Sequence, residues 1–285
     1  MSMNFNFLRS SSRIGYRFST KSFLTGLIVE VFGPTWEVWF GCPANKICSY
    51  HGLRRDDKRF GGDPWLQSTV LTFPWVNLSL ILEAQQQWYQ RHGAGRHFEH
   101  PVPPRDPDHA VGGFGHATDV AACFDADWET WTTGYPQALL SDFEKEPQYI
   151  DIHSWTRVPD RLLDGPLDLD KARLLFWLAR GGPRLFYPPT WEVTVHGYES
   201  TMALSDPNLA CYVLRAFLRL GVFEHWPEFL LDEKLDEARK RYRDYESFNQ
   251  LTLPVRRLWW VAHQVLQLHY VRSGSRVVPE VFEEY

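Results

Sequence analysis

The sequence predicts an α+β protein: an N-terminal antiparallel β-sheet, built as a meander, a Pro/Gly-rich middle, and a C-terminal helical half that carries one extra strand or hairpin. Three observations predict this class. Up to about residue 91, the apolar residues are β-branched or alternate with polar ones, as in strands. From there to residue 165, Gly and Pro are dense, as in loops. The remaining residues contain helix start and stop signals. At 285 residues and 44% apolar, the chain is long enough to bury a core.

The chain divides into three regions on this pattern. Residues 1–91 form the antiparallel β region, residues 92–165 a Pro/Gly/His-rich irregular connection, and residues 166–285 the mainly helical region. We expect the helical region to pack against the sheet as one unit, because each element must bury its apolar face against another.

The N-terminal meander rests on three apolar stretches. Residues 14–18 alternate apolar with small or charged side chains, and the β-branched run 23–32 is followed by the turn signal Gly33-Pro34. Residues 76–82 alternate again, and Pro74 places that strand at an edge or a bulge. Short turns between consecutive strands favour antiparallel pairing.

The first 22 residues allow two interpretations. Basic residues recur every four positions among serines before the first acid, Glu30, as in a mitochondrial transit peptide. The alternation at 14–18 favours a half-buried strand instead, so we expect no cleaved presequence. Four cysteines without a secretory leader indicate a reducing compartment. We expect the cytoplasm if residues 14–18 form a strand, and the mitochondrion if the first 22 residues are a transit peptide.

Four helices are predicted in the last third, over 168–182, 205–221, 227–248 and 254–271. The first two end at Gly181 and Gly221, which suit a left-handed cap, and the second has Pro207 in its first turn. In the third, acids precede bases, as the helix dipole favours.

A strand or hairpin is predicted between the first two of these helices, over 184–197. It contains Pro-Thr-Trp-Glu-Val at 189–193, identical to residues 34–38, although the flanking residues do not match and a duplicated domain is not indicated. We expect both copies to be strands and both tryptophans, Trp36 and Trp191, to be mostly buried.

A histidine-rich loop, residues 96–119, is the first candidate for chemistry. The residues that could converge on zinc are His97, His100 and His109, completed by Glu99, Asp108 or His116. Four prolines between residues 101 and 107 stiffen the chain and separate these ligands, and no HExxH spacing is present. We therefore expect a solvated loop and no cofactor, with a divalent metal such as zinc as the alternative.

Two smaller clusters have metal-ligand chemistry. Asp125, Asp127 and Glu129 would share one face of an extended strand, as carboxylates that hold Mg²⁺ do, but the solvent face of an edge strand is the plainer interpretation. Another set consists of Cys42, Cys48 and His51, which are three potential zinc ligands at a spacing that matches no zinc ribbon or finger. Cys42 is expected in the core.

The composition narrows the function classes. The net charge of −5 is spread without a basic stripe, so a nucleic-acid partner is not indicated, and the longest uncharged run, 64–82, is too polar to span a membrane. No nucleophile elbow, phosphate-binding loop or activated cysteine is present. His263 and His269 are expected to be packing histidines.

The aromatic content is the remaining clue to function. Thirteen tryptophans imply a tryptophan-rich core, a binding surface or both. We predict a soluble binding or structural protein, without assignable catalysis, that meets a protein partner through an aromatic-rich surface. The alternative is a metal-dependent hydrolase or nuclease that uses the histidine-rich loop and the cluster of Asp125, Asp127 and Glu129.

Overall fold

The computed structural model describes residues 20–39, 61–92, 119–133, 151–153, 155–181, 190–248 and 253–272. These residues form ten α-helices and one 3-10 helix, and no strand occurs among them. In chain order the elements are α2 (Lys21–Trp39), α4 (Pro64–Leu71), α5 (Leu78–His92), α6 (Val120–Thr133), α8 (Asp160–Leu163), α9 (Leu169–Gly181), α10 (Trp191–Met202), α11 (Pro207–Leu220), η4 (Val222–His225), α12 (Glu228–Phe248) and α13 (Leu253–Arg272). The predicted α+β class is therefore wrong.

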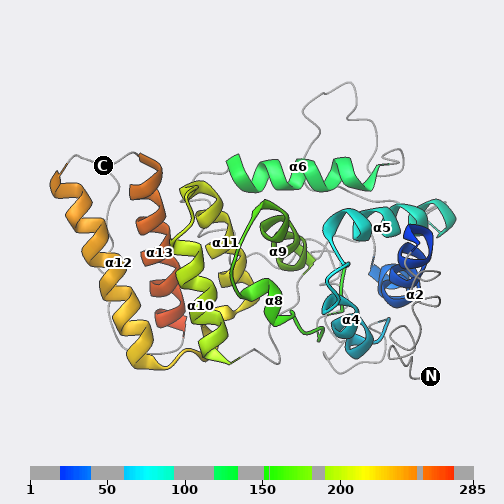
Figure 1. The fold of residues 1–285 in the computed structure, drawn as a ribbon, viewed down its shortest axis with the longest axis horizontal. Coiled ribbons are helices and arrows are strands. Elements are labelled where there is room, and N and C mark those ends of the chain that lie inside the picture. Colours follow the sequence, from blue (N-terminus) through cyan, green and yellow to red (C-terminus); the bar gives the residue numbers. More distant parts are fainter. Residues whose placement is uncertain are drawn as a thin grey trace.

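The helices follow one another along the long axis of the molecule (Figure 1). Helices α2, α4 and α5 pack together at one end, α9 lies in the middle, and α10, α11, α13 and the outermost α12 form the other end. Helix α6 lies across the top, above α9 and between α5 and α11. One hydrophobic core runs through all of them. Its largest fully buried side chains include Trp36, Trp177, Phe32, Phe124 and Phe217.

Helix α2 replaces the strand predicted over residues 23–32 and the turn predicted at Gly33-Pro34. Its fully buried side chains Ile28, Phe32 and Trp36 are four residues apart, which is helical spacing, and they outweigh the β-propensity of the β-branched residues around them. Gly33 is not part of a turn: a Cβ there would lie 3.3 Å from the Trp88 ring, so this glycine lets α5 approach closely. Pro34 lies inside the helix.

Helix α5 replaces the alternating strand predicted at 76–82. Asn77 begins it, because its side-chain oxygen accepts the Leu80 backbone N–H at 2.9 Å. Ile81, Ala84 and Trp88 then form the buried stripe toward α2. The alternation that suggested a strand begins before this helix and continues into it, where Leu78, Leu80, Ile81 and Leu82 are all buried.

Helix α10 replaces the strand predicted inside the helical half. Thr190 precedes its first residue, Trp191, so the second Pro-Thr-Trp-Glu-Val string opens a helix while the first lies within α2. Neither copy is a strand. The burial expected for Trp36 is confirmed, and Trp191 is partly buried, edge-on to Phe229.

The four helices predicted after residue 166 are present as α9, α11, α12 and α13. In α11, Pro207 occupies the first turn behind Asp206, whose side chain accepts the Asn208 backbone N–H, and Gly221 ends the helix in the left-handed conformation with φ 77°. The start and end signals predicted for this helix are confirmed.

The connection predicted to be irregular contains α6 and α8. Helix α6 begins at a cap: the Asp119 carboxylate accepts the backbone N–H groups of Ala121 and Ala122 at 3.0 and 3.1 Å. The alternation of Asp125, Asp127 and Glu129 predicts an extended strand here, whereas the buried residues Val120, Phe124, Asp127 and Trp131 follow helical spacing. Helix α6 contacts α5 and α9.

Candidate functional site

Two arginines of α9 bind two carboxylates of α6. Asp125 pairs with Arg173 at the surface, and Asp127 pairs with the buried Arg180 at 2.6 Å. Both guanidinium groups also stack on the ring of Phe124, at 5.2 and 5.3 Å from its centre. The carboxylates predicted to face one side of a strand therefore belong to a helix, where Asp127 points inward and Asp125 outward, and each binds an arginine.

Asp151 completes the buried cluster around Arg180. Its carboxylate accepts a hydrogen bond from Arg180 Nη2 at 2.8 Å, and its side chain is 4% exposed. Burial raises the pKa of Asp151, the nearby Asp127 raises it further, and Arg180 opposes both. Cys123 lies close to the same cluster, and burial, followed by Asp127, raises the pKa of its thiol to about 12. These groups fasten α6, α9 and residue 151 together.

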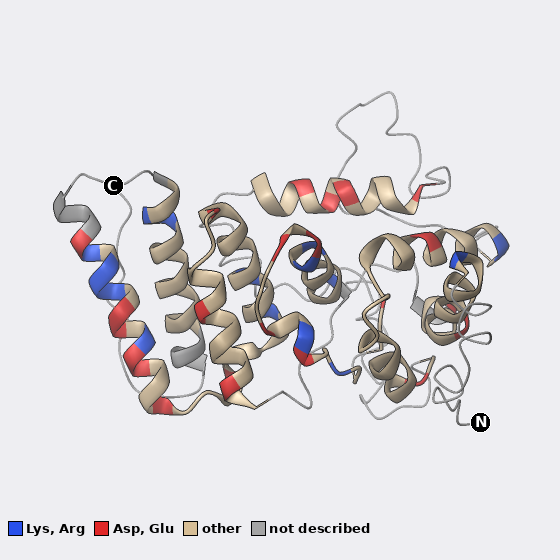
Figure 2. Ribbon diagram, viewed as in Figure 1, with Lys and Arg blue, Asp and Glu red and all other residues tan. Residues whose placement is uncertain are grey.

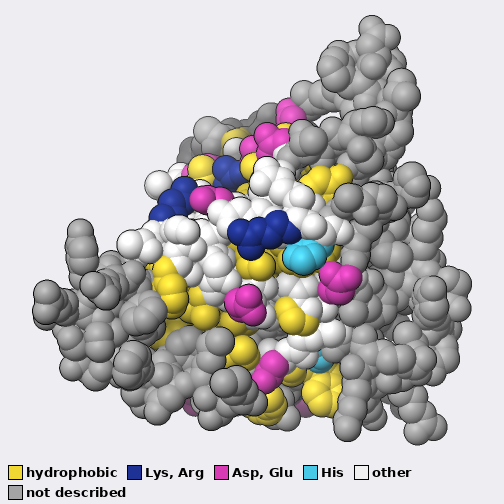
Figure 3. All heavy atoms as spheres, turned by 90° about the vertical axis from the view of Figure 1, so that its right-hand side faces the viewer, with side chains coloured by type: hydrophobic (Ala, Val, Ile, Leu, Met, Phe, Trp, Pro, Cys, Tyr) yellow, Lys and Arg dark blue, Asp and Glu magenta, His cyan; other side chains and the backbone are white. Residues whose placement is uncertain are grey.

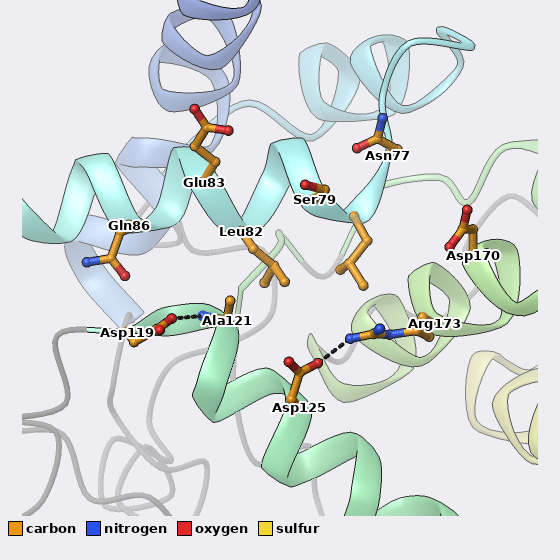
Figure 4. A pocket seen from close by; sticks show the side chains of 11 residues that line it. Asn77, Ser79, Leu82, Glu83, Gln86, Asp119, Ala121, Asp125, Asp170 and Arg173 are labelled. Carbon is orange, nitrogen blue, oxygen red and sulfur yellow. Dashed lines mark hydrogen bonds and ion pairs between the residues drawn. The ribbon is translucent and has the colours of Figure 1, made fainter.

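A cavity of about 620 Å³ opens between α5, α6 and α9. Figure 4 shows Asp125 and Arg173 pointing toward one another across the gap between α6 and α9, while Leu82 points from α5 toward Ala121. The lining residues are Asn77, Leu78, Ser79, Leu82, Glu83 and Gln86 of the α5 region, Asp119, Ala121 and Asp125 of the α6 region, and Asp170 and Arg173 of α9. A volume of this size is typical of ligand sites.

Helix starts position the polar lining. Asn77 and Asp119 cap α5 and α6, and Asp170 lies in the first turn of α9. The Gln86 side chain links α5 to the start of α6, because its oxygen accepts the Val120 backbone N–H at 2.8 Å. The cavity is therefore built where three helices begin, with an apolar floor and a polar rim.

The rim is acidic. Four of its side chains are carboxylates, and Arg173 is the single base among the lining residues of the described chain. Helix α6 carries only acidic charges, as Figure 2 shows, whereas α12 mixes both signs along its length. Lys21 pairs with Glu83 at 2.5 Å and offsets part of this charge. The cavity therefore favours a cation over an anion.

Two tryptophans are exposed, Trp65 of α4 and Trp155, at 66% and 36% exposure. The elements that bear them are joined by Gln67, whose side-chain oxygen accepts hydrogen bonds from the His153 backbone N–H and the Thr156 hydroxyl, both at 2.9 Å. The other described tryptophan side chains are buried or partly buried, so the aromatic excess mainly fills the core. On the face in Figure 3, acidic and basic side chains are interspersed.

Most of the histidine and cysteine candidates lie outside the described residues. These are His97, Glu99, His100, Asp108, His109 and His116, together with Cys42, Cys48 and His51. Within the described part, no three His, Cys, Asp or Glu side chains lie close enough to hold a metal ion together. The carboxylates of Asp125, Asp127 and Glu129 do not converge, because α6 spreads them around a helix. This cluster therefore does not support the hydrolase or nuclease alternative.

His263 is buried in α13, where we expected a packing histidine. Burial, followed by the nearby charges of Arg239 and Arg243, lowers its pKa from 6.5 to about 4. The imidazole is therefore neutral at pH 7. The side chain of His269 lies outside the described set.

The sequence did not indicate the cavity. Arg173 and Arg180 are seven residues apart on a predicted helix, and the two aspartates that they bind are two apart on α6. No local pattern links those spacings, because the pairing depends on how α6 crosses α9. The caps Asn77 and Asp119 were the available signals, since each is a preferred N-cap type before an apolar run.

Among the described helices, none has the length and apolar character needed to cross a bilayer. No protein-family model matches the sequence, and no curated protein or solved structure is significantly similar to it.

Proposed function

We propose that the protein is a binding protein whose cavity between α5, α6 and α9 takes a small aliphatic ligand with more than one ammonium group. The observation that carries the proposal is the cavity itself, about 620 Å³ in volume, with carboxylates around an apolar floor. Leu78, Leu82 and Ala121 suit a methylene chain, and the carboxylates suit its charged ends.

The arrangement of the carboxylates favours a polyamine over a metal ion. A metal requires ligand atoms that converge on one point, and the described carboxylates do not form such a group. In the cavity they come from three different helices, with Glu83 on α5, Asp125 on α6 and Asp170 on α9. Separate ammonium groups on a flexible chain match separate carboxylates.

Calorimetric titration with spermidine tests this function, with magnesium chloride at equal ionic strength as the competing cation. We expect spermidine to bind, and Asp170→Asn and Asp125→Asn each to weaken it by about ten-fold, since a charge-assisted hydrogen bond is lost. Asp232→Asn, an exposed carboxylate on α12, is the matched control and leaves the affinity unchanged. Equal binding of all four proteins, or no binding by the wild type, contradicts the proposal.

A second role, binding of a protein partner, is favoured by the exposed Trp65. Tryptophan is enriched where protein interfaces concentrate their binding energy, and Gln67 holds its helix rigidly against the Trp155 segment. Co-purification from native cells tests this role. It is quantified for the wild type, for the double variant Trp65→Ala/Trp155→Ala, and for the control Leu169→Ala. We expect a specific partner to be lost in the tryptophan variant alone. Retention of every co-purifying protein contradicts it.

A further inference from the structure

We propose that the exposed face of α12 binds a second copy of this chain, with the two α12 helices antiparallel about a two-fold axis near residue 238. Helix α12 is the outermost helix at its end of the molecule (Figure 1). Its buried residues Leu231, Ala238 and Tyr242 lie on the inner side, where α12 packs on α13. The opposite side is exposed in this chain.

The exposed face of α12 changes sign halfway along the helix. Its exposed charged residues are acidic at positions 228, 232, 233, 236 and 237, then basic at 240, 241 and 243, and Asp244 follows. Figure 2 shows most acids toward one end of α12 and most bases toward the other. The helix dipole favours this order only within the first and last turns. The sign changes in the middle of the 21-residue helix, so the dipole does not account for it.

A two-fold axis at this midpoint makes the face complementary to itself. In such a contact, residue i of one copy meets residue j of the other, and j meets i. With antiparallel helices and the axis near residue 238, Asp236 faces Lys240 of the partner subunit, and the same pair forms a second time across the axis. The acidic first half of each α12 then lies along the basic second half of the other, which electrostatic complementarity favours.

The two side chains of this pair are available for it. Asp236 is 78% exposed, and its carboxylate lies 3.7 Å from Arg239 in a loose ion pair. Lys240 is exposed and makes no ion pair within the described part of the chain. The spacing of four residues would allow Asp236 to pair with Lys240 of its own helix, yet the carboxylate lies beside Arg239 instead.

An exposed phenylalanine extends the same face at its acidic end. Phe229 is 65% exposed and meets Trp191 of α10 edge-on. It precedes Asp236 by seven residues, about two helical turns, so both lie on one side of α12. In the antiparallel pair, the last turn of the partner's α12 covers this ring. Burial of the ring adds an apolar contribution, because exposed ion pairs are individually weak.

Sedimentation equilibrium of the full chain tests this contact and does not depend on the ligand proposed for the cavity. At about 50 mM salt we expect a monomer–dimer equilibrium. At about 500 mM salt the dissociation constant should rise about ten-fold or more, because salt screens exposed charges. Asp236→Lys and Lys240→Asp should each raise it about ten-fold or more at low salt, because each places two pairs of like charges in contact.

Glu30→Lys is the matched control, since it makes the same charge change as Asp236→Lys at an exposed position of α2, at the opposite end of the molecule. It should leave the dissociation constant near the wild-type value. Phe229→Ala should raise the constant about five-fold or more and keep its salt dependence, because it removes an apolar contact only. Circular dichroism shows whether each variant is folded.

Mixing the two charge-reversal variants is the sharpest test. Asp236→Lys and Lys240→Asp should associate weakly alone, and an equal mixture should regain the wild-type affinity, because each substituted position then faces the opposite charge. A wild type that stays monomeric at about 500 μM and low salt overturns the proposal and leaves this face to a different partner. A dimer that both reversals leave intact, or a mixture that does not associate, overturns it as well.

Discussion

At the scale of single residues, the tightest fit among the glycines of the described residues lies between α10 and the end of α8. A Cβ on Gly197 would lie 1.7 Å from the Leu163 carbonyl oxygen, so only glycine fits there. On α2, by contrast, a Cβ on Gly26 would meet nothing within 4 Å. The same residue type is therefore required at one helical position and dispensable at the other.

Gly197→Ala is expected to destabilise the protein by about 2 kcal/mol or more, because the α8–α10 contact must open to admit the methyl group. Gly26→Ala is the matched control and is expected to stabilise by about 0.5 to 1 kcal/mol, through helix propensity. Urea denaturation of both variants measures the two changes. Equal effects would show that the backbone contact at Leu163 is not maintained in solution.

His263 gives the protein a specific sensitivity to acid. Its pKa is about 4 in the folded chain and 6.5 when unfolded, so the unfolded state takes up the proton first as the pH falls. The wild type should lose roughly 3 kcal/mol from this residue between pH 6.5 and about pH 4, and nothing from it above pH 6.5.

The pH dependence of the unfolding free energy in His263→Gln measures this loss, because glutamine does not titrate. We expect the wild-type curve to fall more steeply than the variant's below pH 6.5. His225→Gln, at an exposed histidine of η4, is the control and should keep the wild-type slope. Parallel curves for the wild type and His263→Gln would exclude the buried, neutral imidazole.

At the scale of elements, one buried glutamine joins three segments that are distant in sequence. Gln67 of α4 donates to the Thr35 hydroxyl of α2 at 2.7 Å and accepts from the His153 N–H and the Thr156 hydroxyl. It is 0% exposed. With a further bond from its amide nitrogen to the Val31 carbonyl oxygen at 3.3 Å, these four bonds orient α4 against α2 and against the segment that begins at Asp151.

Gln67→Leu should destabilise the protein by about 2 to 4 kcal/mol, because it leaves several buried polar groups without this partner. Gln264→Leu, at a partly exposed position of α13, is the matched control and should change stability by no more than about 0.5 kcal/mol. Thermal and urea denaturation provide the measurement. A loss below about 1 kcal/mol for Gln67→Leu would mean that water replaces the glutamine at little cost.

At the scale of the whole molecule, α9 connects the two ends. It packs on α11 on one side and on α5 and α6 on the other. Trp177 of α9 is fully buried and meets Phe32 of α2 edge-on, with ring centres 6.3 Å apart. The core is therefore continuous across the elongated array, and the two ends should unfold together.

We expect a single urea transition, with coincident curves from circular dichroism and from a fluorophore placed on α12. Trp177→Ala should lower the unfolding free energy by about 3 to 5 kcal/mol, since it empties a large volume at the centre. Trp65→Ala, at a tryptophan that is 66% exposed, is the matched control with a change near zero. Two separate transitions in the wild type would instead show independent ends.

Helices whose start, end and apolar stripe are encoded locally could be predicted from the sequence. Pro207 and Gly221 bound α11, acids precede bases in α12, and the apolar stripes of α9 and α13 recur at helical spacing, so each segment specifies its own conformation. Helices α2, α5 and α10 depend on tertiary packing, because their β-branched residues and short alternations favour strands. Helices α2 and α5 form where Phe32, Trp36 and Trp88 are buried together. The cavity was likewise a tertiary outcome, since the pairing of Asp125 and Asp127 with Arg173 and Arg180 is set by how two helices cross, a relation that no window of sequence contains.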